Sequence, residues 1–306
     1  MKSLSNFLSI RYAGISLMVL ILALGFALPL PVFADAAITP PVKIQHPPFA
    51  EAKCLSCHKA AADGKPSPKT FIMNQPDLCY QCHERKDKNT VIHPAMKGKC
   101  TACHSAHESA IKPLLKSKVE DMCTTCHLHD DLGMDLPIKH LALVMSKSCV
   151  RCHNPHSSPY PKMLKAVTPI LCTYCHTDMG RDLNNENVHI HPAVYLGCEN
   201  CHAPHGSENP KLLKQMPNDL CFTCHDKKMI DGGHPKAGHP TSGQPDPIYK
   251  EKDLSCISCH KPHFSPNKKV LRYNFNTAPY DGSICSVCHW QVVMSPPGPP
   301  RPDWND

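Results

Sequence analysis

The chain has 306 residues and a formal net charge of +7, with 41% hydrophobic and only 6% aromatic residues. This composition excludes an ordinary globular protein with a large apolar core, because so few Phe, Tyr and Trp side chains would form only a thin one. Cys and His are abundant instead, at 20 and 22 residues, and Pro outnumbers Gly by 32 to 14. Something other than apolar side chains must therefore fill the interior.

Residues 1–34 have the pattern of a secretory signal peptide. Lys2 and Arg11 give a positive start, residues 13–30 are apolar, and small Ala34 precedes the expected cleavage point. An uncleaved membrane anchor is the alternative, because the apolar stretch is long for a signal. We expect cleavage and export, which would place the mature protein in the periplasm, associated with the outer membrane, or outside the cell.

Every Cys lies in one of ten Cys-x-x-Cys-His motifs. Many Cys in an exported protein usually form disulfides, but this spacing is that of c-type haem attachment. The two thiols can form thioethers to one porphyrin, and the adjacent proximal His can bind its iron. A zinc knuckle or a redox dithiol could explain one such motif, but ten with no Cys left over favour haem. We predict ten covalently bound haem c groups, numbered as sites 1 to 10 in chain order: Cys54/Cys57/His58, Cys79/Cys82/His83, Cys100/Cys103/His104, Cys123/Cys126/His127, Cys149/Cys152/His153, Cys172/Cys175/His176, Cys198/Cys201/His202, Cys221/Cys224/His225, Cys256/Cys259/His260 and Cys285/Cys288/His289.

The motifs alternate between two kinds, which indicates a two-haem module repeated five times. The odd-numbered sites carry the first kind of motif and the even-numbered sites carry the second kind. After the signal peptide at 1–34, we expect haem modules at 35–88, 89–135, 136–185, 186–232 and 233–294, followed by a Pro-rich tail at 295–306.

The links between motifs are too short and too rich in Pro for long helices or a sheet. We therefore expect a mainly irregular, elongated chain with short α-helices, built around its haems and with no sheet of note. Each second motif is expected to start a short helix. The expected N-cap residues are Asp77, Asp121, Asp219 and Ser283, with Thr168-Pro169 in that role in the third module.

Twelve of the 22 His lie outside the ten motifs, and most of these recur at matched positions. Such recurrence predicts that they are the second, distal axial ligands of the irons. One set precedes each first motif, and another stands three residues after the proximal His of a first motif. These are His46, His93, His140, His191 and His239, and His107, His156, His205 and His263. Further candidates are His129, His189 and His234.

His107 and its equivalents lie too close to their own proximal His to bind the same iron, so each should serve a neighbouring haem. The first module carries Ala61 at this position. If these His serve the second site of their own module, the site at Cys79 and Cys82 is short of a ligand. If they serve the preceding module, the shortage is expected at Cys285 and Cys288. The deficient site would use one of the three remaining His, use Met, or stay open.

Iron with two His ligands is saturated, low-spin and relatively low in potential, so it passes electrons and makes no bonds. We therefore expect an electron-transfer protein and not an enzyme. Each ferric haem of this kind adds a charge of about −1, which would make the holoprotein mildly acidic and bring many Lys to propionates. No aromatic stacking pattern supports binding of nucleic acid.

The alternation of motifs resembles the doubled-CxxCH multihaem cytochromes. CHNPHSS at 152–158 and CHAPHGSENPKLLK at 201–214 are similar to the repeat in the decahaem periplasmic subunits of metal-reducing porin–cytochrome conduits and their dimethyl-sulfoxide-respiration relatives. The resemblance spans residues 46–289. It implies an elongated row of His/His-ligated haems inserted in an outer-membrane β-barrel, with an outer cytochrome as electron acceptor.

Three functions remain open at this point. The first is electron transfer from a quinol dehydrogenase or a small cytochrome to an outer-membrane or extracellular acceptor. The second is a terminal reductase or oxidase of a small nitrogen or sulfur compound, which needs an open iron. Multihaem nitrite reductases carry a CxxCK motif, whereas every motif here ends in His. The third is a filament-forming structural cytochrome.

Overall fold

The computed structural model describes residues 43–231, 234, 237–273 and 288–289. The expected signal peptide and Pro-rich tail lie outside the described residues, as do Ser283 and Cys285. In the part of the chain that is described, no helix is long and apolar enough to cross a membrane.

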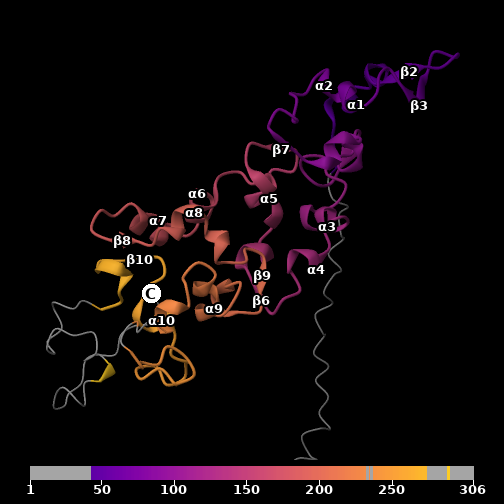
Figure 1. The fold of residues 1–306 in the computed structure, drawn as a ribbon. Helices are drawn as coiled ribbons and strands as arrows, with labels where there is room; N and C mark the ends of the chain where they lie inside the picture. The colour runs from indigo at the N-terminus through magenta and orange to yellow at the C-terminus, as the bar shows by residue number, and fades with distance from the viewer. Residues whose placement is uncertain (1–42, 232–233, 235–236, 274–287, 290–306) are drawn as a thin grey trace, which may run out of the picture. The chain divides into compact units, whose positions relative to one another are not determined.

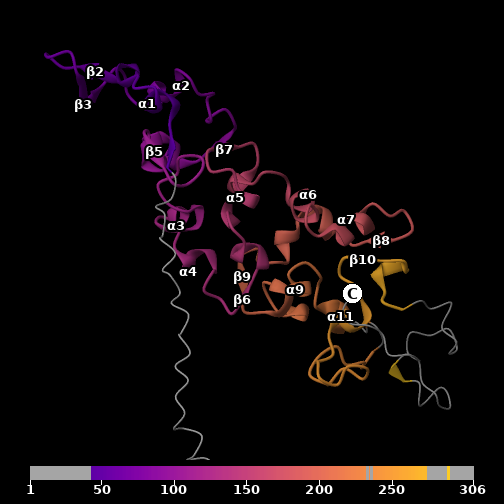
Figure 2. The ribbon, with the colours of Figure 1, turned by 180° about the vertical axis from the view of Figure 1, so that it is seen from behind.

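The described helices are short and are joined by long irregular segments (Figures 1 and 2). The longest α-helix among them, α7, has 7 residues, and helices of this length are not stable in isolation. The α-helices are α1 (Pro47–Ala50), α2 (Asp77–Tyr80), α3 (Val119–Thr124), α4 (His129–Leu132), α5 (Ser148–Cys152), α6 (Thr168–Thr173), α7 (Thr177–Leu183), α8 (Ala193–Leu196), α9 (Pro217–Phe222), α10 (Lys228–Asp231) and α11 (Cys256–Cys259). Single turns of 3-10 helix lie at Cys54–Ser56, Pro94–Lys97, Cys100–Ala102, Leu141–Val144, Pro161–Met163, Cys198–Asn200, Pro210–Leu212 and Lys268–Val270.

The strands of the described residues form antiparallel pairs, and no sheet there has more than two strands. One pair is a hairpin inside the first module, and the others join successive modules. The pairs are β2 (His58–Ala60) with β3 (Pro66–Phe71), β1 (Ile44–Gln45) with β5 (Glu108–Ser109), β4 (Val91–Ile92) with β7 (Ser157–Ser158), β6 (Ile138–Lys139) with β9 (Gly206–Ser207), and β8 (His189–Ile190) with β10 (Phe264–Ser265). The expected fold class is confirmed: the chain is mainly irregular, with short helices, minimal strand pairing and tandem repeats.

The four pairs between modules have the same register. Each joins the strand before one module's first motif to the strand after the next module's first motif. A further backbone bond continues each pair, as where the His46 N–H donates to the His107 carbonyl over 2.7 Å. The equivalent bonds join His93 to His156, His140 to His205, and His191 to His263, over 2.9, 2.9 and 2.8 Å. Two candidate distal His from different modules are thus held side by side.

The expected N-caps of the second motifs are wrong by one to three residues. The observed caps are Pro76, Lys118, Val167 and Met216, and none of them makes a side-chain cap bond. Asp77, Asp121 and Asp219 lie instead in the first turn of their helices, where a carboxylate is stabilised by the positive end of the helix dipole. These helices also end within the second motifs and do not begin there.

The protein itself supplies almost no apolar core. Among the described residues, only Leu115, Tyr249 and Leu254 are buried hydrophobic side chains. Large apolar side chains such as Tyr174 and Leu196 are 86% and 78% exposed. The most buried side chains are small and polar, among them Ser157, Ser158 and Ser265. Burial of about 25 cal/mol per Å² of apolar area is the main driving force of folding, so the polypeptide alone has little of it.

We therefore expect the chain to lack a cooperative fold when no haem is attached. Protein expressed without haem attachment should show no sigmoidal thermal transition by circular dichroism and should be digested by protease throughout. Haem-loaded protein, prepared in parallel, is the control and should unfold in a cooperative transition. A cooperative transition in haem-free protein would contradict this expectation.

Candidate functional site

Each proximal His has a second His ring beside it. The ring centres of the ten pairs are 5.8–6.2 Å apart. With metal–nitrogen bonds of about 2 Å, two imidazoles on opposite sides of one metal ion have ring centres roughly 6 Å apart. The ring pairs therefore fit the iron of haem c, and the two Cys of each motif provide its covalent attachment.

The His that precedes each first motif lies next to the proximal His of the second motif in its own module. In the first module, for example, the His46 and His83 ring centres are 5.8 Å apart. Even-numbered sites thus receive their second ring from within the module. The remaining pairs are His93 with His127, His140 with His176, His191 with His225, and His239 with His289.

The His that follows a first motif lies next to the proximal His of the first motif in the preceding module. His107 of the second module and His58 of the first have ring centres 6.1 Å apart. Odd-numbered sites are thus completed across a module boundary. The equivalent pairs are His104 with His156, His153 with His205, and His202 with His263.

The odd-numbered site of the fifth module, site 9, is the site that draws on one of the three remaining His. This corrects the expectation that a shortage would fall at site 10, the site of Cys285 and Cys288. His234 takes the vacant place, with its ring centre 6.0 Å from that of His260. The sequence contains a signal for this role of His234. Gly-His-Pro occurs at both His234 and His239, in the long link before the first motif of the fifth module.

The two remaining candidates do not join any proximal His. The Nδ1 atom of His129 lies 3.6 Å from Asp135 Oδ1, and His189 is exposed within β8. All nine recurrent His and His234 are therefore paired, whereas His129 and His189 are not among the ring pairs of the described residues.

A backbone carbonyl nine residues downstream faces the proximal His of every odd-numbered site. At site 5, His153 Nδ1 lies 2.8 Å from the carbonyl oxygen of Lys162. Such a bond fixes the imidazole orientation, leaves Nε2 for the metal and raises the basicity of the ligand. The same contact joins His58 to Ser67, His104 to Pro113, His202 to Lys211 and His260 to Lys269, over 2.6, 3.1, 2.9 and 3.0 Å. Sequence analysis missed this contact, because its acceptor is a main-chain atom.

The loop that presents this carbonyl has a strained backbone in the last three modules. Lys162, Lys211 and Lys269 have φ of 55°, 58° and 57°, in the left-handed region that costs an L-residue about 1–2 kcal/mol. A buried Ser braces the loop: in the third module the Ser158 hydroxyl donates to the Leu164 carbonyl and accepts from the Tyr160 N–H. The Pro-Lys-x-Leu segments at 161–164 and 210–213, and the equivalent Lys-Lys-Val-Leu at 268–271, therefore support the proximal His.

Burial keeps several of the paired His neutral, which is the form that binds a metal. It lowers the pKa of His263 to about 4. Burial is also the largest cause of the lowered pKa of His93, His140, His156, His191, His205 and His260. The neighbouring His of each pair lowers the pKa further.

Attachment thiols of successive modules lie in contact. The Cys172 thiol is hydrogen-bonded to Cys198, which raises the pKa of Cys172 and lowers that of Cys198 to about 7. The same bond joins Cys79 to Cys100, Cys123 to Cys149, and Cys221 to Cys256. Even-numbered sites 2, 4, 6 and 8 therefore adjoin sites 3, 5, 7 and 9.

The sites within one module are also adjacent. Cys57 of site 1 raises the pKa of Cys79 of site 2, after the larger effects of burial and Cys100. Cys103 acts in the same way on Cys123, Cys152 on Cys172, and Cys201 on Cys221. Together with the thiol contacts between modules, these electrostatic effects indicate that successive sites from 1 to 9 lie near one another in chain order.

Most second Cys of the even-numbered motifs are little covered by the polypeptide. Four of these residues are exposed, namely Cys82, Cys126, Cys175 and Cys224. The reason is that the polypeptide has almost no core of its own to cover them. An exposed thiol is open to a porphyrin, so the position suits thioether formation, and the attached haem would supply the missing cover.

The attachment at site 10 stays a prediction. Cys288 is half-buried, but Cys285, the other Cys of its motif, lies outside the described residues. The structure therefore describes the second thiol and the proximal His of this site, and the first thiol is assigned from the motif alone.

Polar side chains before the second motif secure three of the junctions between modules. Gln75 Oε1 accepts the Thr101 N–H over 3.1 Å, and Glu120 Oε1 accepts the Ser148 N–H over 2.8 Å. Asn218 Oδ1 accepts the Cys256 N–H, also over 2.8 Å. Each bond satisfies an N–H at or next to the start of the next first motif.

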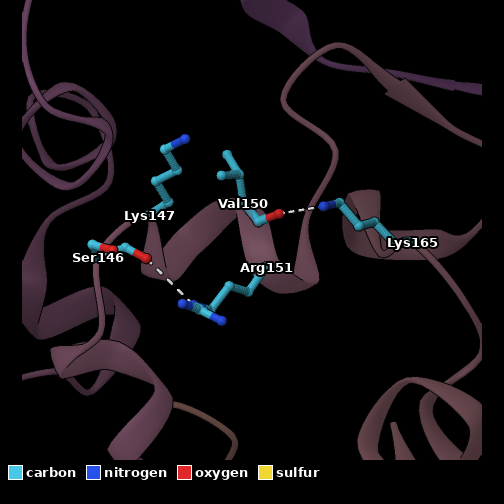
Figure 3. Close-up of a pocket in the computed structure, with 5 residues that line it drawn as sticks. All are labelled: Ser146, Lys147, Val150, Arg151 and Lys165. Carbon is cyan, nitrogen blue, oxygen red and sulfur yellow. Dashed lines mark hydrogen bonds between the residues drawn. The ribbon is translucent and has the colours of Figure 1, made fainter. Parts of the chain in front are cut away.

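An open pocket of about 450 Å³ lies beside site 5 (Figure 3). It is lined by the cationic side chains of Lys147, Arg151 and Lys165, together with Ser146 and Val150. Arg151 Nε donates to the Ser146 carbonyl over 3.3 Å, and Lys165 Nζ donates to the Val150 carbonyl. Such a lining suits carboxylates, including the propionates of a haem.

The geometry of these sites agrees with what the comparisons show. The doubled CXXCH motif family matches residues 46–88, 93–131, 142–181, 191–230 and 247–294. These stretches cover more than half of the chain, and each holds two of the ten motifs. The protein is thus a multihaem c-type cytochrome, a class that transfers electrons, and its ten motifs attach ten haem c groups. It belongs to the doubled-CXXCH family. No curated protein matches the chain.

The ring pairs across modules lead to a specific prediction. His156→Ala should leave site 3 in the second module without its second ligand, although His156 belongs to the third module. We expect a high-spin ferric signal worth one haem in ten by electron paramagnetic resonance (EPR). The control His129→Ala should give none. A low-spin spectrum like that of the unsubstituted protein would contradict the assignment.

The strained loop gives a second prediction. Lys211→Gly should raise the free energy of unfolding of the holoprotein by about 1 kcal/mol, because Gly adopts positive φ without steric cost. Lys214→Gly, in ordinary backbone three residues on, should lower it by a similar amount. Denaturant titration followed by haem absorbance measures both changes. Equal effects of the two variants would show that the strain is absent.

Proposed function

We propose that the protein carries electrons in multiple steps along ten closely spaced haems, each held by two His. The observation that carries this proposal is the set of ten His ring pairs, one for each proximal His. Bound haem c supplies a one-electron Fe(III)/Fe(II) couple at each site. The distal ligands are His46, His93, His107, His140, His156, His191, His205, His234, His239 and His263.

The chain's own residues perform three tasks in this function. The paired imidazoles occupy both axial positions, which leaves no coordination place for a substrate. The attachment Cys of successive sites lie beside one another, as Cys172 and Cys198 do between sites 6 and 7, so the haems that they bind would be adjacent. The carbonyl bonds to proximal His such as His153 hold the rings at a fixed orientation.

We further propose that this row of haems works between a periplasmic or inner-membrane donor and an outer-membrane or extracellular acceptor. The signal-like pattern of residues 1–34 and the resemblance of residues 46–289 to decahaem conduit subunits support this placement. The partners would be a quinol dehydrogenase or small cytochrome on one side, and an outer-membrane β-barrel with an outer cytochrome on the other.

The ring pairs also weigh on the two competing functions. A terminal reductase or oxidase requires an open iron, whereas each of the ten proximal His faces another His. A filament in which neighbouring copies share axial ligands requires a ligand from a second chain. Here His234 completes the last odd-numbered site from within the same chain. Both observations favour a self-contained electron carrier.

Loss of a central site should interrupt the path and not merely weaken it. We expect His153→Ala, at site 5, to slow electron transfer from one end to the other far more than it slows reduction of the near end. Protein tethered to an electrode through a C-terminal tag provides the measurement, because the early and late phases of reduction report near and far sites. His129→Ala is the control. Equal slowing of the two phases would count against a linear path.

A further inference from the structure

We propose that site 10 is electronically distinct from the other nine sites because its two axial imidazoles stand perpendicular to each other. The proposal rests on the proposed function insofar as His239 and His289 are taken to bind one iron. It assigns to the last module a haem with a different spectroscopic signature and a higher reduction potential than coplanar rings would give.

The ring planes divide the pairs into two groups. The His239 and His289 rings meet at 88°. In the other nine pairs the planes meet at 17–45°. The separation of the His239 and His289 ring centres, 6.2 Å, is nevertheless within the range of the others. The separation of the ring centres at site 10 is thus like that of the other sites, whereas the angle between the ring planes differs.

The strand pairing between modules explains the difference. His46, His93, His140 and His191 each donate a backbone N–H to the next module, which fixes the direction from which their rings approach. In the part of the chain that the structure describes, the His239 N–H makes no such bond to another module. Its ring turns toward its own loop instead, with Nδ1 2.8 Å from the carbonyl oxygen of Pro240.

The loop alone does not cause the perpendicular arrangement. His234 comes from the same loop, and its ring meets that of His260 at 26°. The proximal rings differ in their support as well. At site 9 the Lys269 carbonyl holds the His260 Nδ1 atom, as the equivalent carbonyl does at every odd-numbered site. His289 belongs to an even-numbered site, which carries the second kind of motif. Among the even-numbered sites of the described residues, site 10 is therefore the one whose distal His lacks the backbone bond between modules.

Ring orientation decides how two imidazoles act on the iron. Near-parallel rings donate π density into the same iron d orbital, which separates it in energy from its partner orbital and favours the ferric state. Perpendicular rings act on one orbital each, so the two orbitals stay close in energy and this preference is lost. The first case gives a rhombic low-spin ferric spectrum, and the second gives a strongly axial spectrum with a low-field signal.

A higher potential at site 10 would draw electrons toward the last module. Axial ligation and its immediate surroundings are among the main means by which a protein sets a haem potential. The C-terminal module is thus assigned as the end of the row at which electrons accumulate.

EPR of the oxidised holoprotein tests the proposal. We expect one-tenth of the low-spin intensity in an axial low-field signal and the rest in rhombic signals. His239→Ala should abolish the axial signal. The matched control His234→Ala, in the same loop, should keep the axial signal and remove a rhombic one. During reductive titration the axial signal should disappear before the rhombic signals.

The outcomes separate this inference from the proposed function. A spectrum with ten rhombic low-spin haems would overturn the perpendicular site and leave the proposed electron carrier intact. Survival of the axial signal in His239→Ala, or its disappearance last during reduction, would also overturn the inference. A high-spin signal in the unsubstituted protein would instead contradict saturated iron, on which the proposed function depends.

Discussion

The pairing of His rings across module boundaries is the interaction on which the rest of the structure depends. Each odd-numbered site but the last takes its second ring from the following module, as site 1 does from His107. The described polypeptide buries only three apolar side chains, so no core of its own holds the modules together. Iron bound at each ring pair would therefore act as a cross-link between segments far apart in sequence.

This arrangement ties folding to electron transfer. The strand pairs that place His46 beside His107 also bring the ligands of sites 1 and 2 to one point in the backbone. The thiol contacts, such as that between Cys79 and Cys100, then continue the row into the next module. The backbone pairing that joins the modules thus also holds neighbouring haem sites close. Each module after the first supplies a ligand to the module before it.

Sequence predicted the parts of this account that depend on residue identity. The motif spacing gave the attachment residues, and recurrence at fixed offsets identified the nine His that the structure pairs, such as His156 and His191. It did not predict the module that each His serves, because that depends on backbone pairing between distant segments. The sequence named His234 as one of three candidates for a deficient site but did not select among them. It missed the carbonyl that faces His153, because that acceptor is a main-chain atom.

The central claim is that every iron is bound by two His from this chain. Near-infrared magnetic circular dichroism of the oxidised protein tests it most directly, because His/His, His/Met and high-spin haems give different charge-transfer bands. With intensity normalised to haem content, the account predicts a single class of band, that of His/His ligation, accounting for all ten haems. A His/Met band, or high-spin intensity equal to one haem or more, would contradict it.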